Sequence, residues 1–200
     1  DTFIVNTVLG REEIMRFFLD EWRPTPVVAP WNGGSGFYPK DNREAADAIL
    51  KAGDPRLAEF ATSIAVGRAF VAERGWSERP EGEEKILMLR RLRARLPAAT
   101  LAWLDAAVVI GDDRLLFPPL LGTGGNDGRL DFSNNYQQRV VEVLSSREPD
   151  ALASALFGTF ASSRFKGAMG QYQPAANERS NPWDFVLLIE GSLMFAGAAT

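Results

Sequence analysis

The chain has 200 residues, of which 46% are hydrophobic and 24% charged, a balance typical of a soluble globular domain. A formal net charge of −4 at pH 7 argues against a general polyanion-binding protein, because that affinity comes from Lys and Arg displacing counterions. The sequence contains no cysteine and no histidine. This excludes disulfides, Cys/His zinc sites, cysteine nucleophiles and an imidazole general base.

The organisation along the chain is that of one helical domain over residues 1–200. The sequence begins with Asp1 rather than Met and ends within an apolar run, so we expect a fragment of a longer chain. That apolar run, residues 185–199, contains Glu190 and is shorter than the roughly 20 residues of a membrane helix. We therefore expect no membrane contact, and the absence of cysteine favours a cytoplasmic, reducing compartment.

In the N-terminal half, β-branched and apolar residues predict an edge strand over 2–9 and a short strand over 27–29. Helical spacing and cap residues predict three helices in the same half. They cover 11–22, 41–51 and 54–73, with Asp41 and Asp54 as the N-caps of the last two. The predicted core positions of the third helix are Leu57, Phe60, Ile64 and Phe70.

In the C-terminal half, the pattern predicts further helices, at 83–96, 98–110, 133–144, 150–160 and 185–196, and an extended arm at 111–119. The helix over 83–96 has an apolar stripe, and Arg90, Arg91, Arg93 and Arg95 are spread around the rest. A solvated amphipathic helix is the first interpretation, and a contact helix for a nucleic-acid backbone or an acidic partner is the second. The predicted fold class is mainly α, with few short strands.

Three ordered loops rich in Gly and Asn interrupt these helices, over residues 30–37, 121–135 and 167–184. Glycine supplies backbone angles that other residues avoid, and Asn and Asp tolerate the left-handed region. We therefore expect tightly folded loops whose amides face a ligand, and we expect all three loops to converge on one surface.

Several kinds of chemistry are compatible with the second loop. It resembles a phosphate cradle before a helix, but it lacks the Gly-Lys-Ser/Thr ending of a Walker loop. Asp127 and Asp131 are candidate ligands for a metal ion, or a carboxylate pair for hydrolysis without histidine. Against these stands a structural interpretation, in which Asp and Asn side chains hold the loop backbone in shape by local hydrogen bonds.

The remaining interpretation is a recognition surface, because polar side chains beside glycine can read the polar edges of nucleic acid. Aromatic residues interleave with them, although core packing is the more common role of each aromatic residue alone. The candidate nucleic-acid-binding residues are Asn32, Gly33, Gly34, Ser35, Asn126, Asp127, Arg129, Asn134, Asn135, Gln138 and Gln171.

The same loops resemble a CRISPR-associated family, the Dpsyc-subtype protein of type I-U (now I-G) systems. The matching stretches are Pro24-Thr-Pro-Val-Val-Ala-Pro-Trp-Asn-Gly-Gly-Ser-Gly-Phe37, Leu121-Gly-Thr-Gly-Gly-Asn-Asp-Gly-Arg-Leu-Asp-Phe-Ser-Asn-Asn135, and residues 167–171 followed by Asn181-Pro-Trp-Asp-Phe185. They occur in the family's order, and the resemblance covers about residues 17–196.

The resemblance implies a non-catalytic large subunit of an RNA-guided antiviral effector complex (Cascade). Such a subunit binds the target DNA and its flanking motif and assembles with the guide RNA, the other subunits and a helicase–nuclease. It needs neither a cofactor nor a small-molecule substrate. Two alternatives remain open: a structural scaffold whose Gly/Asn loops only brace the fold, and a metal-dependent hydrolase that uses Asp127 and Asp131.

Overall fold

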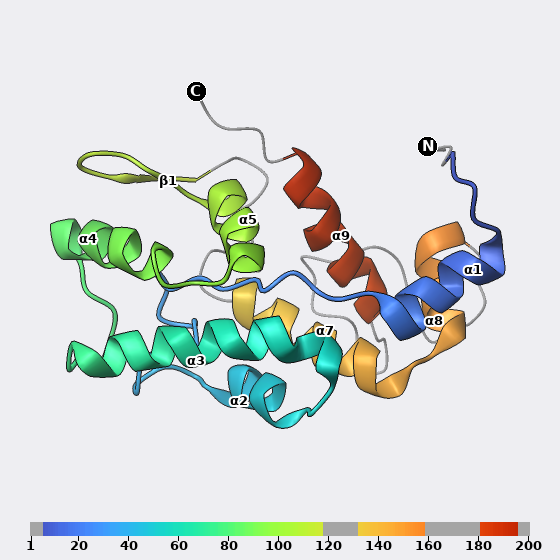
Figure 1. The fold of residues 1–200 in the computed structure, drawn as a ribbon, viewed down its shortest axis with the longest axis horizontal. Coiled ribbons are helices and arrows are strands. Elements are labelled where there is room, and N and C mark those ends of the chain that lie inside the picture. Colours follow the sequence, from blue (N-terminus) through green and yellow to red (C-terminus); the bar gives the residue numbers. More distant parts are fainter. Residues whose placement is uncertain (1–5, 118–131, 159–180, 196–200) are drawn as a thin grey trace, which may run out of the picture.

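The computed structural model of the protein describes residues 6–117, 132–158 and 181–195. The described part is mainly helical, as predicted, and its helices surround an extended segment near the N-terminus (Figure 1). The helices are α1 (Arg11–Arg16), the π-helix η1 (Phe17–Glu21), α2 (Glu44–Lys51), the 3-10 helix η2 (Pro55–Leu57), α3 (Ala58–Glu73), α4 (Gly82–Arg93), α5 (Ala98–Ala107), α7 (Phe132–Ser146), α8 (Pro149–Phe157) and α9 (Pro182–Phe195). None of the described helices is long and apolar enough to cross a membrane.

The helix ends follow from local chemistry. Asp54 accepts a hydrogen bond from the Arg56 amide at 2.9 Å and Pro55 occupies the first helical position, so the restart after α2 is confirmed. Asn181 caps α9 by accepting from the Trp183 amide at 3.1 Å. The predicted cap of α2 was wrong, because the preceding residue is Arg43, whereas Asp41 binds Ser35 and the Tyr38 amide in the loop before it.

Neither of the two predicted strands forms in the described residues, and the observed strands lie elsewhere. Residues 6–9 form no strand, and residues 27–29 are extended without a strand partner. The sheet in the described residues is the hairpin of β1 (Val109–Ile110) and β2 (Leu115–Leu116), antiparallel with Val109 opposite Leu116. A helix through residue 110 was expected, but three successive β-branched residues from Val108 favour extended backbone, and a turn closes where the Gly111 amide donates to the Arg114 carbonyl.

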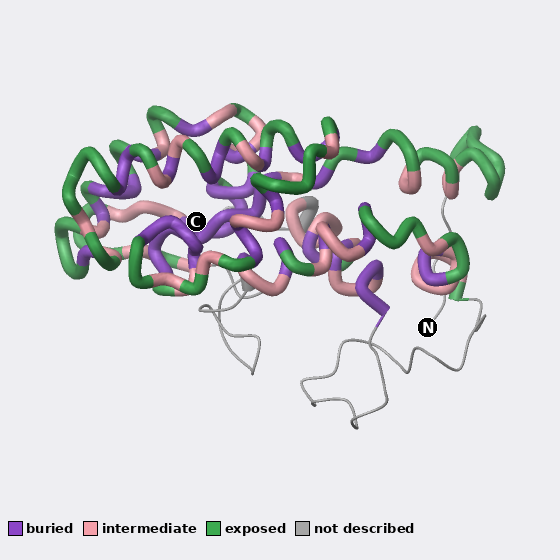
Figure 2. Tube along the Cα trace, turned by 90° about the horizontal axis from the view of Figure 1, so that it is seen from below, coloured by how far each residue is buried: buried purple, intermediate pink, exposed green. Residues whose placement is uncertain are grey.

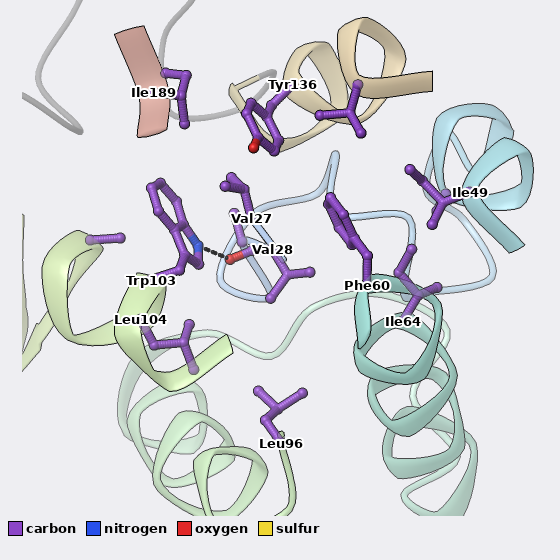
Figure 3. Close-up of a cluster of buried hydrophobic side chains, with 14 of the residues drawn as sticks. Val27, Val28, Ile49, Phe60, Ile64, Leu96, Trp103, Leu104, Tyr136 and Ile189 are labelled. Atoms are coloured by element: carbon purple, nitrogen blue, oxygen red, sulfur yellow. Dashed lines mark hydrogen bonds between the residues drawn. The ribbon is translucent and has the colours of Figure 1, made fainter. Parts of the chain in front are cut away.

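The core lies where the helices meet the extended segment. α7 packs against α2 and α9, α9 also contacts α5 and α8, and α3 packs on α2 and α5. Figure 3 shows Val27 and Val28 between Trp103 of α5, Tyr136 of α7 and Phe60 of α3. The side chains predicted for the core of α3, Leu57, Phe60, Ile64 and Phe70, are buried. Buried positions alternate with exposed ones along the outer helices, as Figure 2 shows.

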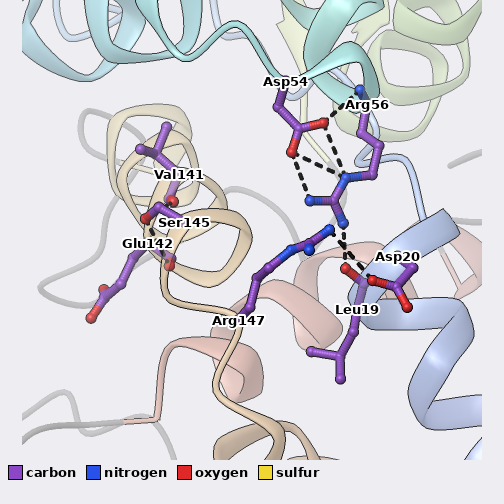
Figure 4. A network of polar contacts seen from close by, with 8 residues as sticks. All are labelled: Leu19, Asp20, Asp54, Arg56, Val141, Glu142, Ser145 and Arg147. Carbon is purple, nitrogen blue, oxygen red and sulfur yellow. Dashed lines mark hydrogen bonds and ion pairs between the residues drawn. The ribbon is translucent and has the colours of Figure 1, made fainter.

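The N-terminal unit, which is α1, η1 and Trp22, contacts the C-terminal helices through aromatic side chains and one cation–π contact. The guanidinium of Arg11 lies 4.4 Å from the centre of the Phe157 ring, and the rings of Trp22 and Trp183 are 5.5 Å apart. Beside them, Arg56 is only 8% exposed, binds Asp54 and donates to the Leu19 carbonyl at 2.7 Å (Figure 4). The ring contacts thus hold the N-terminal helices to α8 and α9, and Arg56 holds η1 to η2.

Candidate functional site

The most unusual feature of the described chain is residues 25–31, which we call the central segment. It is almost wholly buried, and it runs without regular structure into a turn at residues 30–31; among the described residues, no neighbouring strand takes its hydrogen bonds. Side chains donate to four of its carbonyls instead, and nearby backbone amides donate to those of Thr25 and Ala29. Gln137 donates to Val27 at 3.5 Å, Trp103 to Val28 at 2.6 Å, Tyr38 to Pro30 at 2.9 Å and Arg79 to Trp31 at 3.2 Å.

The beginning of the central segment is held by one carboxylate. Glu190 of α9 accepts from the amide and the hydroxyl of Thr25, each at 2.7 Å, and from the hydroxyl of Tyr136 at 2.5 Å. Burial, followed by the charge of Glu190, raises the pKa of Tyr136 well above its ordinary value, so this phenol remains a hydrogen-bond donor. Thus Glu190 joins the central segment, α7 and α9 at a single point.

The first Gly/Asn loop continues from the central segment and is largely internal. Asn32 is 5% exposed and Ser35 is fully buried, so these two residues do not lie on the surface as the recognition interpretation expected. The Ser35 hydroxyl donates to Asp41 at 2.6 Å and accepts from the Phe37 amide. Burial raises the pKa of Asp41, although its hydrogen bonds to Ser35 and to loop amides lower it in part. Gly33 is exposed and Gly34 half-buried.

The second loop is described from residue 132 onwards. Asn126, Asp127, Arg129 and Asp131 lie outside the described residues, so the metal and hydrolase interpretations stay untested predictions. Ser133 is buried at the start of α7, and its hydroxyl has no hydrogen-bond partner in the part of the chain that the structure describes. Asn134 is half-buried and Gln138 is exposed; because they are four positions apart, they share the outer face of α7. Asn135 is half-buried and partnered.

The third loop is described only at its end. Gln171 lies outside the described residues, whereas Asn181 is buried and donates to the Ala151 carbonyl of α8 at 2.7 Å. Trp183 packs among the aromatic rings of the N-terminal unit, with its indole nitrogen buried and unpartnered. The described end of this motif is therefore internal.

Three of the four arginines on α4 and directly after it pair with acidic side chains of the same chain. Arg90 lies 3.7 Å from Asp112 at the hairpin, Arg93 pairs with Asp105 of α5, and Arg95 pairs with Glu73 of α3 at 2.5 Å. Arg91 is exposed and makes no hydrogen bond or ion pair within the described ranges. The predicted apolar stripe is buried, so the solvated amphipathic helix describes α4 better than a contact helix does.

Sequence reasoning missed the residues that organise this region, namely Thr25, Gln137 and Glu190. One signal was available: beyond its first turn, α9 carries one carboxylate, Glu190, among apolar residues, and such a carboxylate needs donors because an unpaired buried charge is costly. Among the described residues, no group of three or more acidic side chains is arranged to hold a metal ion. Neither the protein-family models nor the curated proteins compared with the chain give a match.

Proposed function

We propose that this chain is a non-catalytic, nucleic-acid-binding large subunit of an RNA-guided CRISPR interference complex. Its task is to bind the target DNA and its flanking motif and to assemble with the guide RNA, the other subunits and the helicase–nuclease. The proposal rests on the resemblance of three sequence stretches to the Dpsyc-subtype family.

One structural observation supports treating these stretches as one unit. Thr25 belongs to the first stretch, Tyr136 directly follows the second, and Glu190 lies five residues after the third. Hydrogen bonds of 2.5 and 2.7 Å join these three residues. Segments that are distant in the sequence thus have a common attachment point, which is what a surface built from several loops requires.

Within the described residues, the outer face of α7 is the part of this unit best suited to touch nucleic acid. Asn134 and Gln138 present amides there, directly after the second motif. Amide side chains donate and accept at once, so they can bind phosphate oxygens, sugars and base edges. In contrast, the buried Asn32 and Ser35 act within the protein.

A structural scaffold is the second candidate, and the first loop favours it. Ser35, Asp41 and the backbone of residues 36–38 form a closed hydrogen-bonded unit, and Arg68 donates to the Gly36 carbonyl at 3.0 Å. In this case the loops brace the helices, and another part of the complex binds nucleic acid.

The deciding experiment uses the chain assembled with its guide RNA and partner subunits. Target duplexes with and without the flanking motif are titrated against wild type, the Asn126→Ala/Arg129→Ala variant and the Asn134→Ala/Gln138→Ala variant. Ser146→Ala, an exposed change at the far end of α7, serves as the control. Thermal melts of each variant are recorded in parallel.

Loss of duplex binding by at least tenfold in either double variant, with melting and assembly unchanged, supports the recognition function. Lowered melting temperatures with binding lost only through unfolding support the scaffold. Wild-type binding by both folded double variants refutes the assignment of recognition to these residues.

A further inference from the structure

Two arginines beside the first loop have buried donors without acceptors. The Nε of Arg43, directly before α2, and the Nη2 of Arg68 on α3 are both buried and unpartnered. Within the described part of the chain, the side chain of Arg43 makes no hydrogen bond or ion pair, whereas its backbone carbonyl accepts from the Asp47 amide at 2.8 Å. A buried donor without an acceptor costs about 1–3 kcal/mol, so two such donors in one region call for an explanation.

Gly36 lies beside the backbone of Arg43 and the side chain of Arg68. Its φ of 74° lies in the left-handed region, and its carbonyl accepts from the Arg68 Nε at 3.0 Å. A Cβ built on Gly36 would lie 2.8 Å from the Ala46 Cβ and 3.9 Å from the Arg43 Cα. The loop backbone therefore runs against α2 on one side and reaches Arg68 of α3 on the other.

More positive than negative charge lies near Gly36. Asp47 pairs with the Arg68 Nη1 at 2.6 Å, and its pKa is lowered first by that hydrogen bond and then by the charges of Arg68 and Arg43. Two guanidinium groups thus act on one carboxylate. Asp41 is close in sequence, but its carboxylate binds Ser35 and the loop amides instead. Within the described residues, Arg68 therefore has a carboxylate bound to it and Arg43 has none.

We propose that Arg43 and Arg68 form a subsite for a phosphate group. A phosphate supplies both the acceptors that the two buried donors lack and the negative charge that the second guanidinium lacks, whereas a water molecule supplies only an acceptor. Guanidinium groups present their donors as a planar fork that matches phosphate oxygens. If the proposed function holds, the phosphate is one of a nucleic-acid backbone, and this identification rests on that function; a free phosphate ion has the same chemistry.

The test uses the full chain and two probes. The first probe is inorganic phosphate, with the melting temperature compared against sodium chloride at equal ionic strength. The second is a mixed-sequence single-stranded oligonucleotide, titrated at several salt concentrations. The variant is Arg43→Gln, because the Arg43 side chain makes no described bond whose loss would unfold the protein, and the substitution keeps the backbone carbonyl that caps α2. The matched control is Arg91→Gln, which removes the same charge from an exposed site on α4.

We expect phosphate to raise the melting temperature of wild type and of Arg91→Gln, and not that of Arg43→Gln. For the oligonucleotide, Arg43→Gln should weaken binding several-fold and reduce the slope of log affinity against log salt by about one phosphate contact. If Arg43→Gln itself melts early in chloride, Arg43→Lys replaces it. Arg43→Lys keeps the charge without the fork, and it should retain less than half of the phosphate-dependent shift.

The outcomes separate the subsite from the proposed function. A phosphate shift that depends on Arg43, without oligonucleotide binding, supports the subsite and argues against nucleic acid as its source. Oligonucleotide binding that Arg43→Gln leaves unchanged, together with no phosphate shift in wild type, overturns the subsite; the buried donors then bind water only.

Discussion

Replacing Tyr136 by Phe tests whether Glu190 holds the central segment to α7. The hydroxyl of Tyr136 is fully buried and donates to the Glu190 carboxylate at 2.5 Å. A hydrogen bond to a charged group contributes about 1.5–3 kcal/mol, so Tyr136→Phe should lower the free energy of unfolding by about 2 kcal/mol. With a urea m-value of about 2 kcal/mol/M, the midpoint of unfolding falls by about 1 M.

A double-mutant cycle in urea sharpens this test. Glu190→Gln removes the charge that Tyr136 binds, so the second substitution should cost less in the presence of the first, with a coupling of about 1–2 kcal/mol. Tyr38→Phe is the matched control: it removes a buried hydroxyl that donates to the neutral Pro30 carbonyl at 2.9 Å. It should cost roughly 1 kcal/mol and show no coupling with Glu190→Gln. A loss below about 0.5 kcal/mol in Tyr136→Phe, or equal couplings for both tyrosines, would refute the reasoning.

Three further predictions concern burial and packing. Burial raises the pKa of Tyr38 and Tyr136 above the ordinary value of 10.0, so as the pH rises these tyrosines lose their protons in the unfolded chain before they do in the folded protein. The free energy of unfolding should therefore fall above pH 10, by up to about 1.4 kcal/mol per pH unit for each tyrosine. Urea melts from pH 8 to 11 measure this fall, and Tyr136→Phe should make it smaller. Gly67→Ala should lower the melting temperature, because the added Cβ would lie 2.3 Å from the Phe37 ring. Gly191→Ala is the matched control: its Cβ would meet no neighbouring atom of the described residues within 4 Å, so it should stabilise α9 by up to about 1 kcal/mol in thermal melts. Trp103→Phe should cost about 2–4 kcal/mol in urea, since it leaves the Val28 carbonyl without its donor and opens a cavity; a loss no larger than that of Trp76→Phe, a half-buried site, would contradict this.

The helices were largely predictable because their signals are local. Caps, proline positions and apolar spacing placed α3 and α9 close to their observed bounds, and Gly53 ends α2 with a φ of 66°, as expected. The central segment was not predictable in the same way. Its apolar residues, Val27 to Ala29, indicate burial but do not show whether a strand or side chains will satisfy the backbone.

The candidate site was harder to predict for the same reason. Asn32 and Ser35 are polar and lie in a glycine-rich loop, a composition typical of a surface, yet Asp41 and the loop amides satisfy Ser35 internally. Nor does the spacing of Arg43 and Arg68 in the sequence show that Gly36 lies at both of them. Contacts of this kind depend on tertiary packing.

The way the central segment is bonded has a consequence for how the chain folds during synthesis. Three of its partners lie far along the sequence: Trp103 is 75 positions from Val28, Gln137 is 110 from Val27, and Glu190 is 165 from Thr25. At about 5–20 residues per second, a ribosome makes Glu190 roughly 10–30 s after Thr25. Until these residues have been made, the Val28 and Val27 carbonyls and the Thr25 amide lack their native side-chain partners, and pairing over such separations closes slowly. We therefore expect residues 25–28 to be a segment of the nascent chain to which chaperones bind.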